Sequence, residues 1–227
     1  MSQGLSSLSN KQERLYQNAS DAVISDRTYN LVLGGVIVYG ILVNVLMVKL
    51  LTPVFLGISP LVLLIGYLVC SIAGIMITYR SSDPLISFLG YNLVVLPVGA
   101  VLSVSLQGIA PGVVFQAFLL TGIVTGIMLV AATAFPGTFA GMGRMLFVAL
   151  IGLLIGQVVC MLFRVYPTAL SWAAAAIFSL YIGYDWVKAQ AYVRTLDNAV
   201  DSALDIYMDI INLFLQLVRI LASRDSN

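Results

Sequence analysis

The sequence predicts an all-α membrane protein with seven transmembrane helices in one domain. Hydrophobic residues make up 60% of the chain and charged residues only 9%, and the mean hydropathy is +1.02. Water-soluble domains carry about 25% charged residues, so the composition excludes an ordinary soluble fold. Apolar runs long enough to cross a hydrocarbon core of about 30 Å recur along nearly the whole chain. They predict spans at residues 29–50, 59–79, 85–106, 112–134, 145–163, 168–187 and 199–221.

Short connections separate these runs, and no shift in composition divides them. Consecutive spans are therefore expected to form antiparallel hairpins that pack as one bundle. Proline cannot continue a helix from within but suits its first turn. Prolines accordingly mark most of the loops and helix starts: Pro53, Pro60, Pro84, Pro111, Pro136 and Pro167.

Residues 1–27 are polar and rich in serine and asparagine, without the pattern of a cleaved signal peptide. We interpret them as a cytoplasmic tail that precedes a seven-helix transmembrane domain at residues 28–227. This orientation places seven of the eleven Lys and Arg residues on the inner side, as the positive-inside rule favours. If the seventh run crosses fully, the C-terminus is outside; if it re-enters, both ends are cytoplasmic.

The seventh run carries acids at four-residue spacing. At about 100° per residue, its polar residues fall within a sector of about 120°. A carboxylate at the centre of a membrane helix costs about 2.5–3.5 kcal/mol, so this stripe faces protein or water rather than lipid. We interpret it as the lining of a polar path. The stripe comprises Asp197, Asp201, Asp205, Asp209, Asn212, Gln216 and Arg219.

Two acids of the stripe are candidates for the mouth of such a path. Asp201 and Asp205 lie early in the run, where carboxylates would concentrate cations. The alternative is that they are solvated residues of a first helical turn, which favours negative charge.

Asp185 lies near the end of the sixth run and Asp209 two to three turns into the seventh. An antiparallel hairpin can bring them together, or each can be held separately by a helix end or an arginine. Two carboxylates in contact share a proton more easily than both ionise, and they repel once both are charged. Such a pair is a pH-operated latch whose freed oxygens suit transient calcium binding.

Arg80 ends the second run on the same side of the membrane. It can pair with Asp185 or with Asp83, or it can act as a positive-inside anchor.

The residue types exclude several kinds of chemistry. The chain has no histidine, which removes Ser–His catalysis, histidine-ligated metals and imidazole proton relays. Cys70 and Cys160 cannot build a cysteine-rich metal site, and no phosphate-binding Gly-x-x-x-x-Gly-Lys loop occurs. A net charge of +1 gives no reason to expect a nucleic-acid partner. Carboxylates and arginines remain, which are the parts of an ion or proton pathway or of an aspartyl protease.

Three segments resemble the Bax inhibitor family (transmembrane Bax inhibitor motif proteins), particularly its bacterial branch. The most specific are Leu-Tyr-Ile-Gly-Tyr-Asp at 180–185 and Asp-Ile-Tyr-Met-Asp-Ile-Ile-Asn-Leu-Phe at 205–214. A looser match joins Arg-Ser-Ser-Asp-Pro at 80–84 to Gly-Tyr-Asn at 90–92. The resemblance covers about residues 28–221 of the chain.

The resemblance implies a pH-sensitive calcium leak channel of the bacterial cytoplasmic membrane, with the seventh helix central among the other six. It implies that Asp185 and Asp209 form a di-aspartyl pH sensor with which Arg80 interacts. The protein would then bind protons and conduct calcium ions, and it would be embedded in a lipid bilayer. We expect no resident cofactor and no enzyme activity, and protein partners stay unknown.

Three other functions compete with this interpretation. An intramembrane aspartyl protease normally has glycines before its second aspartate, whereas Asp209 follows Ile-Tyr-Met, and no Pro-Ala-Leu triplet occurs. A regulatory membrane protein would act by binding a protease complex or a cell-death factor. A proton-coupled transporter also uses paired intramembrane acids, but its flux would be coupled to a substrate rather than passive.

Overall fold

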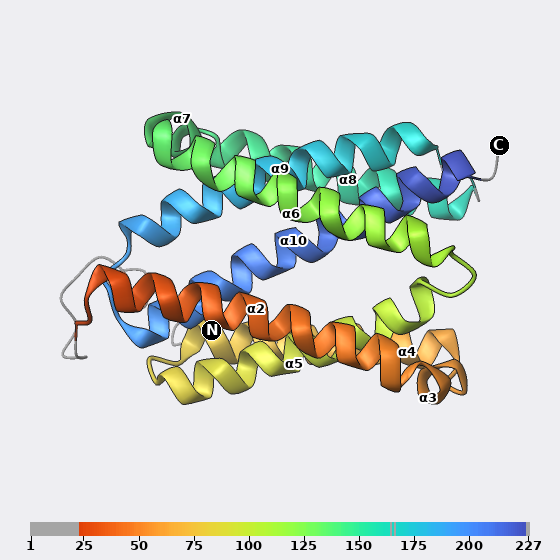
Figure 1. Cartoon of the computed structure of the whole chain (residues 1–227), viewed down its shortest axis with the longest axis horizontal. Helices are drawn as coiled ribbons and strands as arrows, with labels where there is room; N and C mark the ends of the chain where they lie inside the picture. The colour runs from red at the N-terminus through yellow and green to blue at the C-terminus, as the bar shows by residue number, and fades with distance from the viewer. Residues whose placement is uncertain (1–22, 164, 166, 226–227) are drawn as a thin grey trace, which may run out of the picture. The chain divides into compact units, whose positions relative to one another are not determined.

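A computed structural model of the chain describes residues 23–163, 165 and 167–225. Most of the predicted tail at 1–27 therefore lies outside the described residues. In the part that is described, the regular structure is entirely helical and contains no strand (Figure 1). The all-helical prediction is confirmed.

One compact unit consists of the described residues up to Gln107 together with Ala191–Tyr207. Its helix α5 contacts α2, α3 and α4. The contact between α4 and α5 is close because it uses two glycines: a Cβ on Gly74 would overlap the carbonyl oxygen of Gly90. The helices of this unit are α2 (Asp26–Leu50), α3 (Thr52–Leu56), α4 (Pro60–Arg80), α5 (Pro84–Ser105) and the beginning of α10 (Leu196–Asp225).

Side-chain caps begin the long helices of this unit. The Ser25 hydroxyl accepts a hydrogen bond from the Thr28 amide at 3.2 Å at the start of α2. The Asp83 carboxylate accepts one from the Leu85 amide at 2.8 Å at the start of α5, where proline follows the cap. A capped N-terminus satisfies amides that have no partner within the helix. At these two positions, the polar residue that precedes an apolar run therefore also sets where the helix begins.

The second compact unit consists of Gly108–Gln190 and the chain from Met208 onward. The short helix α7 contacts both α6 and α8. Gly183 of α9 lies against the Phe139 ring of α7, and a Cβ there would overlap the ring. Trp186 of α9 donates a hydrogen bond to the Thr133 hydroxyl of α6 at 3.0 Å. The helices are α6 (Pro111–Ala134), α7 (Pro136–Gly141), α8 (Gly143–Leu162), α9 (Thr168–Ala191, all but its last residue) and the rest of α10.

Six helices of the described chain are long and apolar enough to cross a membrane: α2, α4, α5, α6, α8 and α10. Each corresponds to a predicted span. The sixth predicted span, 168–187, is also helical as α9, but α9 is not among the six. The predicted count of seven spans is therefore not confirmed.

The six candidate spans differ in how much of their surface is buried. In the most apolar stretch of α10, 61% of residues are buried, and in that of α5, 50%. The corresponding share is 11% in α8 and 17% in α4 and α6. Large apolar side chains therefore remain exposed on most spans, as expected where lipid tails take the place of water. The acidic helix α10 is instead sheltered along most of its length.

Candidate functional site

Helix α10 carries the whole predicted polar stripe. It begins at Thr195, whose hydroxyl accepts a hydrogen bond from the Asn198 amide at 3.1 Å. Asp197 lies in its first turn, where the helix dipole favours a carboxylate. Asp197, Asp201 and Asp209 are 5%, 2% and 8% exposed, so these acids are buried within the protein, whereas Arg219 at the other end of the stripe is exposed.

In the first unit, the early acids of the stripe lie beside hydroxyl groups. The Ser87 hydroxyl of α5 donates to the Asp197 carboxylate at 2.5 Å. The Tyr79 hydroxyl of α4 donates to the Asp205 carboxylate. Hydrogen bonds to an ionised acceptor are stronger than those between neutral groups. These two contacts therefore tie both carboxylates to the helices packed against the first half of α10.

Asp201 lies between these two positions and is nearly inaccessible to solvent. It is within electrostatic range of Tyr29, as is Arg194. The guanidinium of Arg194 lies 4.8 Å from the Tyr29 ring centre and donates to the Asp26 carboxylate at 2.8 Å. The surroundings of Asp201 thus include a positive charge. A buried acid in such a setting suits an anchored structural role as well as a pore mouth.

In the second unit, Asp185 and Asp209 lie around one tyrosine. Both carboxylates are within electrostatic range of the Tyr181 hydroxyl. Lys188 also acts on Tyr181, and its ammonium group lies 3.2 Å from the Asp185 carboxylate as an ion pair on the same helix. Asp185 and Asp209 are each 8% exposed. Two buried acids thus share one neighbourhood with a single lysine and a phenol.

Local packing of α9 positions this group. Gly183 allows the helix to lie against Phe139, and Tyr184 lies against Gly143 at the start of α8. Trp186, the residue after Asp185, is hydrogen-bonded to Thr133. Contacts on either side of Asp185 therefore fix the rotation of α9 about its axis, and with it the direction of the Asp185 carboxylate.

Arg80 is the last residue of α4 and is exposed. It belongs to the first unit, whereas Asp185 and Asp209 belong to the second, so its interaction with that pair stays a prediction. Among the described residues it forms no ion pair. The alternative partner, Asp83, instead caps α5 through the Leu85 amide.

The predicted calcium ligands form no larger cluster in the described part of the chain. No three residues among its cysteines and acids gather as a metal site there. Asp185 and Asp209 therefore supply two carboxylates as candidate ligands, and transient calcium binding stays a prediction.

Sequence reasoning missed the residues that surround the acids. Lys188 follows Asp185 by three residues and Tyr181 precedes it by four, and both spacings place side chains on one helix face. That signal was present in the sequence. Ser87 and Tyr79 are separated from their acids by 110 and 126 residues, and no local pattern predicts such partners.

A family model described as "Inhibitor of apoptosis-promoting Bax1" matches residues 22–226. The chain is 37% identical over 125 residues to an uncharacterized protein of Helicobacter pylori strain ATCC 700392 / 26695, covering 51% of each chain. It is 31% identical over 169 residues to the uncharacterized protein Cj0236c of Campylobacter jejuni, covering 73% of this chain and 62% of the relative. It is 29% identical over 164 residues to the inner membrane protein YbhL of Escherichia coli K12, covering 55% of this chain and 69% of the relative. The chain thus spans about half the length of the Helicobacter relative that it matches.

Proposed function

The chain belongs to the Bax inhibitor family, and from this premise we propose that it is a pH-sensitive calcium leak channel of a bacterial cytoplasmic membrane. It is a membrane protein with several helices apolar enough to span a bilayer. One Escherichia coli relative is named an inner membrane protein. The proposal of a calcium leak that responds to pH depends on the acids of α9 and α10.

The observation that carries the proposal is the shared neighbourhood of Asp185 and Asp209. Two buried carboxylates around Tyr181 cannot both ionise without repelling each other. At low pH a shared proton holds such a pair together, and at higher pH repulsion separates it. The pair therefore acts as the pH sensor, and the separated oxygens are hard ligands for a passing calcium ion.

The polar stripe of α10 supplies the path. We place α10 at the centre of seven transmembrane helices, with α9 as the sixth and the N-terminus in the cytoplasm. Asp201 and Asp205 then act as acids at one mouth and raise the local concentration of cations. The burial of α10 supports this arrangement, because a helix with this many acids is excluded from lipid.

The experiment is calcium entry into proteoliposomes from about pH 6 to pH 8, the range in which a coupled acid pair can titrate. We expect passive flux that varies with pH in the wild-type protein and not in the Asp185→Asn/Asp209→Asn double variant. Asp83→Asn is the matched control, because it removes an exposed acid that caps α5 and asparagine caps equally well. A double variant with the wild-type pH profile would exclude the di-aspartyl sensor.

Arg80 is proposed as a latch for the acid pair, and its role can be tested separately. Arg80→Ala is expected to change basal calcium flux without abolishing it, because the latch biases the sensor but does not form the path. Lys49→Ala is the control, since Lys49 is likewise an exposed cation near the end of a long helix of the first unit. Unchanged flux in Arg80→Ala would reduce Arg80 to a topological anchor.

A second candidate function is regulation through a protein partner. The description of the family as an inhibitor of apoptosis-promoting Bax1 favours it. Calcium entry no faster than in empty liposomes at every pH would favour this function over the leak. A flux that saturates and requires a co-substrate would instead indicate a proton-coupled transporter.

A further inference from the structure

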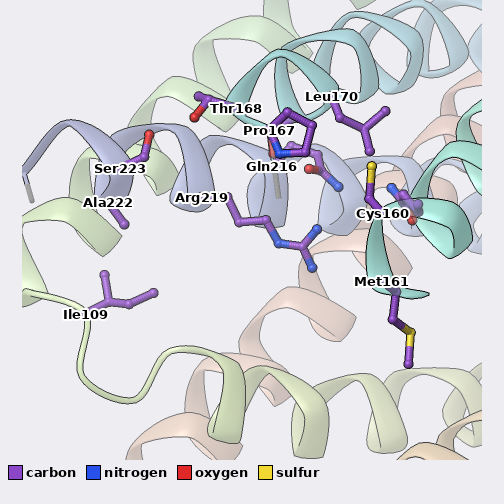
Figure 2. Close-up of a pocket in the computed structure, with 12 residues that line it drawn as sticks. Ile109, Cys160, Met161, Pro167, Thr168, Leu170, Gln216, Arg219, Ala222 and Ser223 are labelled. Atoms are coloured by element: carbon purple, nitrogen blue, oxygen red, sulfur yellow. The ribbon is translucent and has the colours of Figure 1, made fainter. Parts of the chain in front are cut away.

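A cavity of about 650 Å³ lies in the second unit, at the C-terminal end of the polar stripe (Figure 2). The ends of α8 and α10, the beginning of α9 and the segment before α6 surround it. Ile109, Met161 and Leu170 form part of an apolar wall, whereas Gln216 and Arg219 contribute polar groups. None of these residues belongs to the acid group around Asp185.

Arg219 is the charged group of the cavity. Figure 2 shows its side chain extending from α10 into the open space. Within the described residues it forms no hydrogen bond or ion pair. A guanidinium carries five N–H donors in a planar fork that matches two oxygens of a phosphate or carboxylate. The cavity therefore presents an anion-binding group and repels cations.

Gln216 adds a second polar group one turn earlier on α10. It is 5% exposed and lines the same cavity. Its side-chain amide makes no hydrogen bond to any group in the described chain. Because Gln216 lines the cavity, its amide is accessible from that space and can form a hydrogen bond to an oxygen of a bound group. Two donors thus face one space that the fold leaves open.

The position of the cavity at the ends of apolar helices indicates which anion can reach it. Ends of apolar helices lie at the membrane surface, where lipid phosphates concentrate. Trp172 at the start of α9 lies under the guanidinium of Arg224, 5.6 Å from its ring centre. Tryptophan and arginine at helix ends are typical of that interface. An apolar wall beside a single cation suits a headgroup attached to an acyl chain better than a free ion.

We propose that this cavity binds the phosphate of an anionic phospholipid, with Arg219 on the phosphate, the Gln216 amide on a further oxygen and the apolar wall against an acyl chain. The site lies apart from the acid pair. It does not depend on the protein being a calcium leak.

The test measures lipid binding to the purified full chain in detergent by native mass spectrometry. The probes are short-chain phosphatidylglycerol, short-chain phosphatidylcholine and inorganic phosphate. We expect saturable binding of one phosphatidylglycerol and a loss of affinity of about tenfold or more in Arg219→Gln, since a charged hydrogen bond is lost. Arg219→Lys keeps the charge but not the planar fork, and is expected to lose less affinity than Arg219→Gln. This second variant, compared by size-exclusion profile, separates lost binding from lost folding.

Arg224→Gln is the matched control, because it removes the same charge from the same end of α10 outside the cavity lining. We expect its affinity to change by less than about twofold, as for a screened surface charge. An equal loss in both variants would show general surface attraction and overturn the site. Equal binding of phosphatidylcholine, or binding of inorganic phosphate as tight as that of the lipid, would overturn the assignment to an anionic phospholipid.

Discussion

In the first half of α10, the carboxylates of Asp197 and Asp205 accept hydrogen bonds from the hydroxyls of Ser87 and Tyr79. In the second half, the carboxylate of Asp209 shares the surroundings of Tyr181 with a second carboxylate. A hydroxyl donor stabilises a charged acid and does not itself titrate near neutral pH. A neighbouring acid makes the charge of each carboxylate depend on the other. Evenly spaced acids on one helix face thus occupy two environments, one in which hydroxyl groups bind the carboxylates and one in which two carboxylates share a neighbourhood.

The largest effect is expected on the pH dependence of calcium flux when one acid from each half of α10 is replaced. Asp209→Asn removes one member of the acid pair and should abolish the pH dependence of calcium flux. Asp205→Asn, four residues earlier, should leave that dependence in place, since it removes a charge held by Tyr79. Proteoliposome flux at several pH values checks both. If the two variants lost the pH response equally, the distinction between the halves of α10 would be wrong.

The next largest effect concerns the free energy of unfolding and the acids in the first half of α10. Ser87→Ala removes the donor to a 5%-exposed carboxylate, which should lower the free energy of unfolding by about 1.5–3 kcal/mol. Ser179→Ala is the control, because the Ser179 hydroxyl bonds only to the Ala175 carbonyl of its own helix. Its cost should stay below about 0.5 kcal/mol. Unfolding in mixed micelles measures both, and equal losses would show that Asp197 does not need this donor.

A smaller effect is expected from Lys188, the cation beside the acid pair at the second half of α10. Lys188 lies 3.2 Å from the Asp185 carboxylate as an ion pair on the same helix. Lys188→Met removes this charge and should change the pH dependence of calcium flux by less than Asp209→Asn does, because a partly exposed ion pair contributes only about 0–1 kcal/mol. Lys188→Arg keeps the charge and should keep the wild-type pH profile of proteoliposome flux. A wild-type profile in Lys188→Met would mean that Lys188 does not influence the response.

The helices were predictable because each long apolar run has the length of a span, and every predicted run is helical. Helices α3 and α7 were missed, since five and six residues are too few to show a period or a span. Helix α9 was predicted as a span because residues 168–187 form an apolar run of sufficient length. The hydropathy of α9 falls toward its end because this part contains Asp185, Lys188 and several tyrosine and tryptophan residues. For this reason α9 is not among the six candidate spans.

The acids were predictable as a stripe because helical geometry alone aligns residues four apart. Their partners were not, because Tyr79 and Ser87 approach α10 only through tertiary packing. Arg219 was recognised as part of the stripe, but its cavity depends on how α6, α8 and α9 end. Sequence thus identified which residues are polar within the membrane region and left open what each of them meets.

The Tyr29 hydroxyl lies 3.1 Å from that of Ser202, 173 residues later in the chain. The first helix therefore cannot complete its packing until the last one has left the ribosome. At about 5–20 residues per second, that interval is roughly 9–35 s. Tyr29 lacks this partner throughout the interval, and Tyr79 and Ser87 lack theirs for the 126 and 110 residues that separate them from Asp205 and Asp197. A nascent chain of this kind is vulnerable to membrane quality control during synthesis, and truncation before α10 would leave a product that cannot mature.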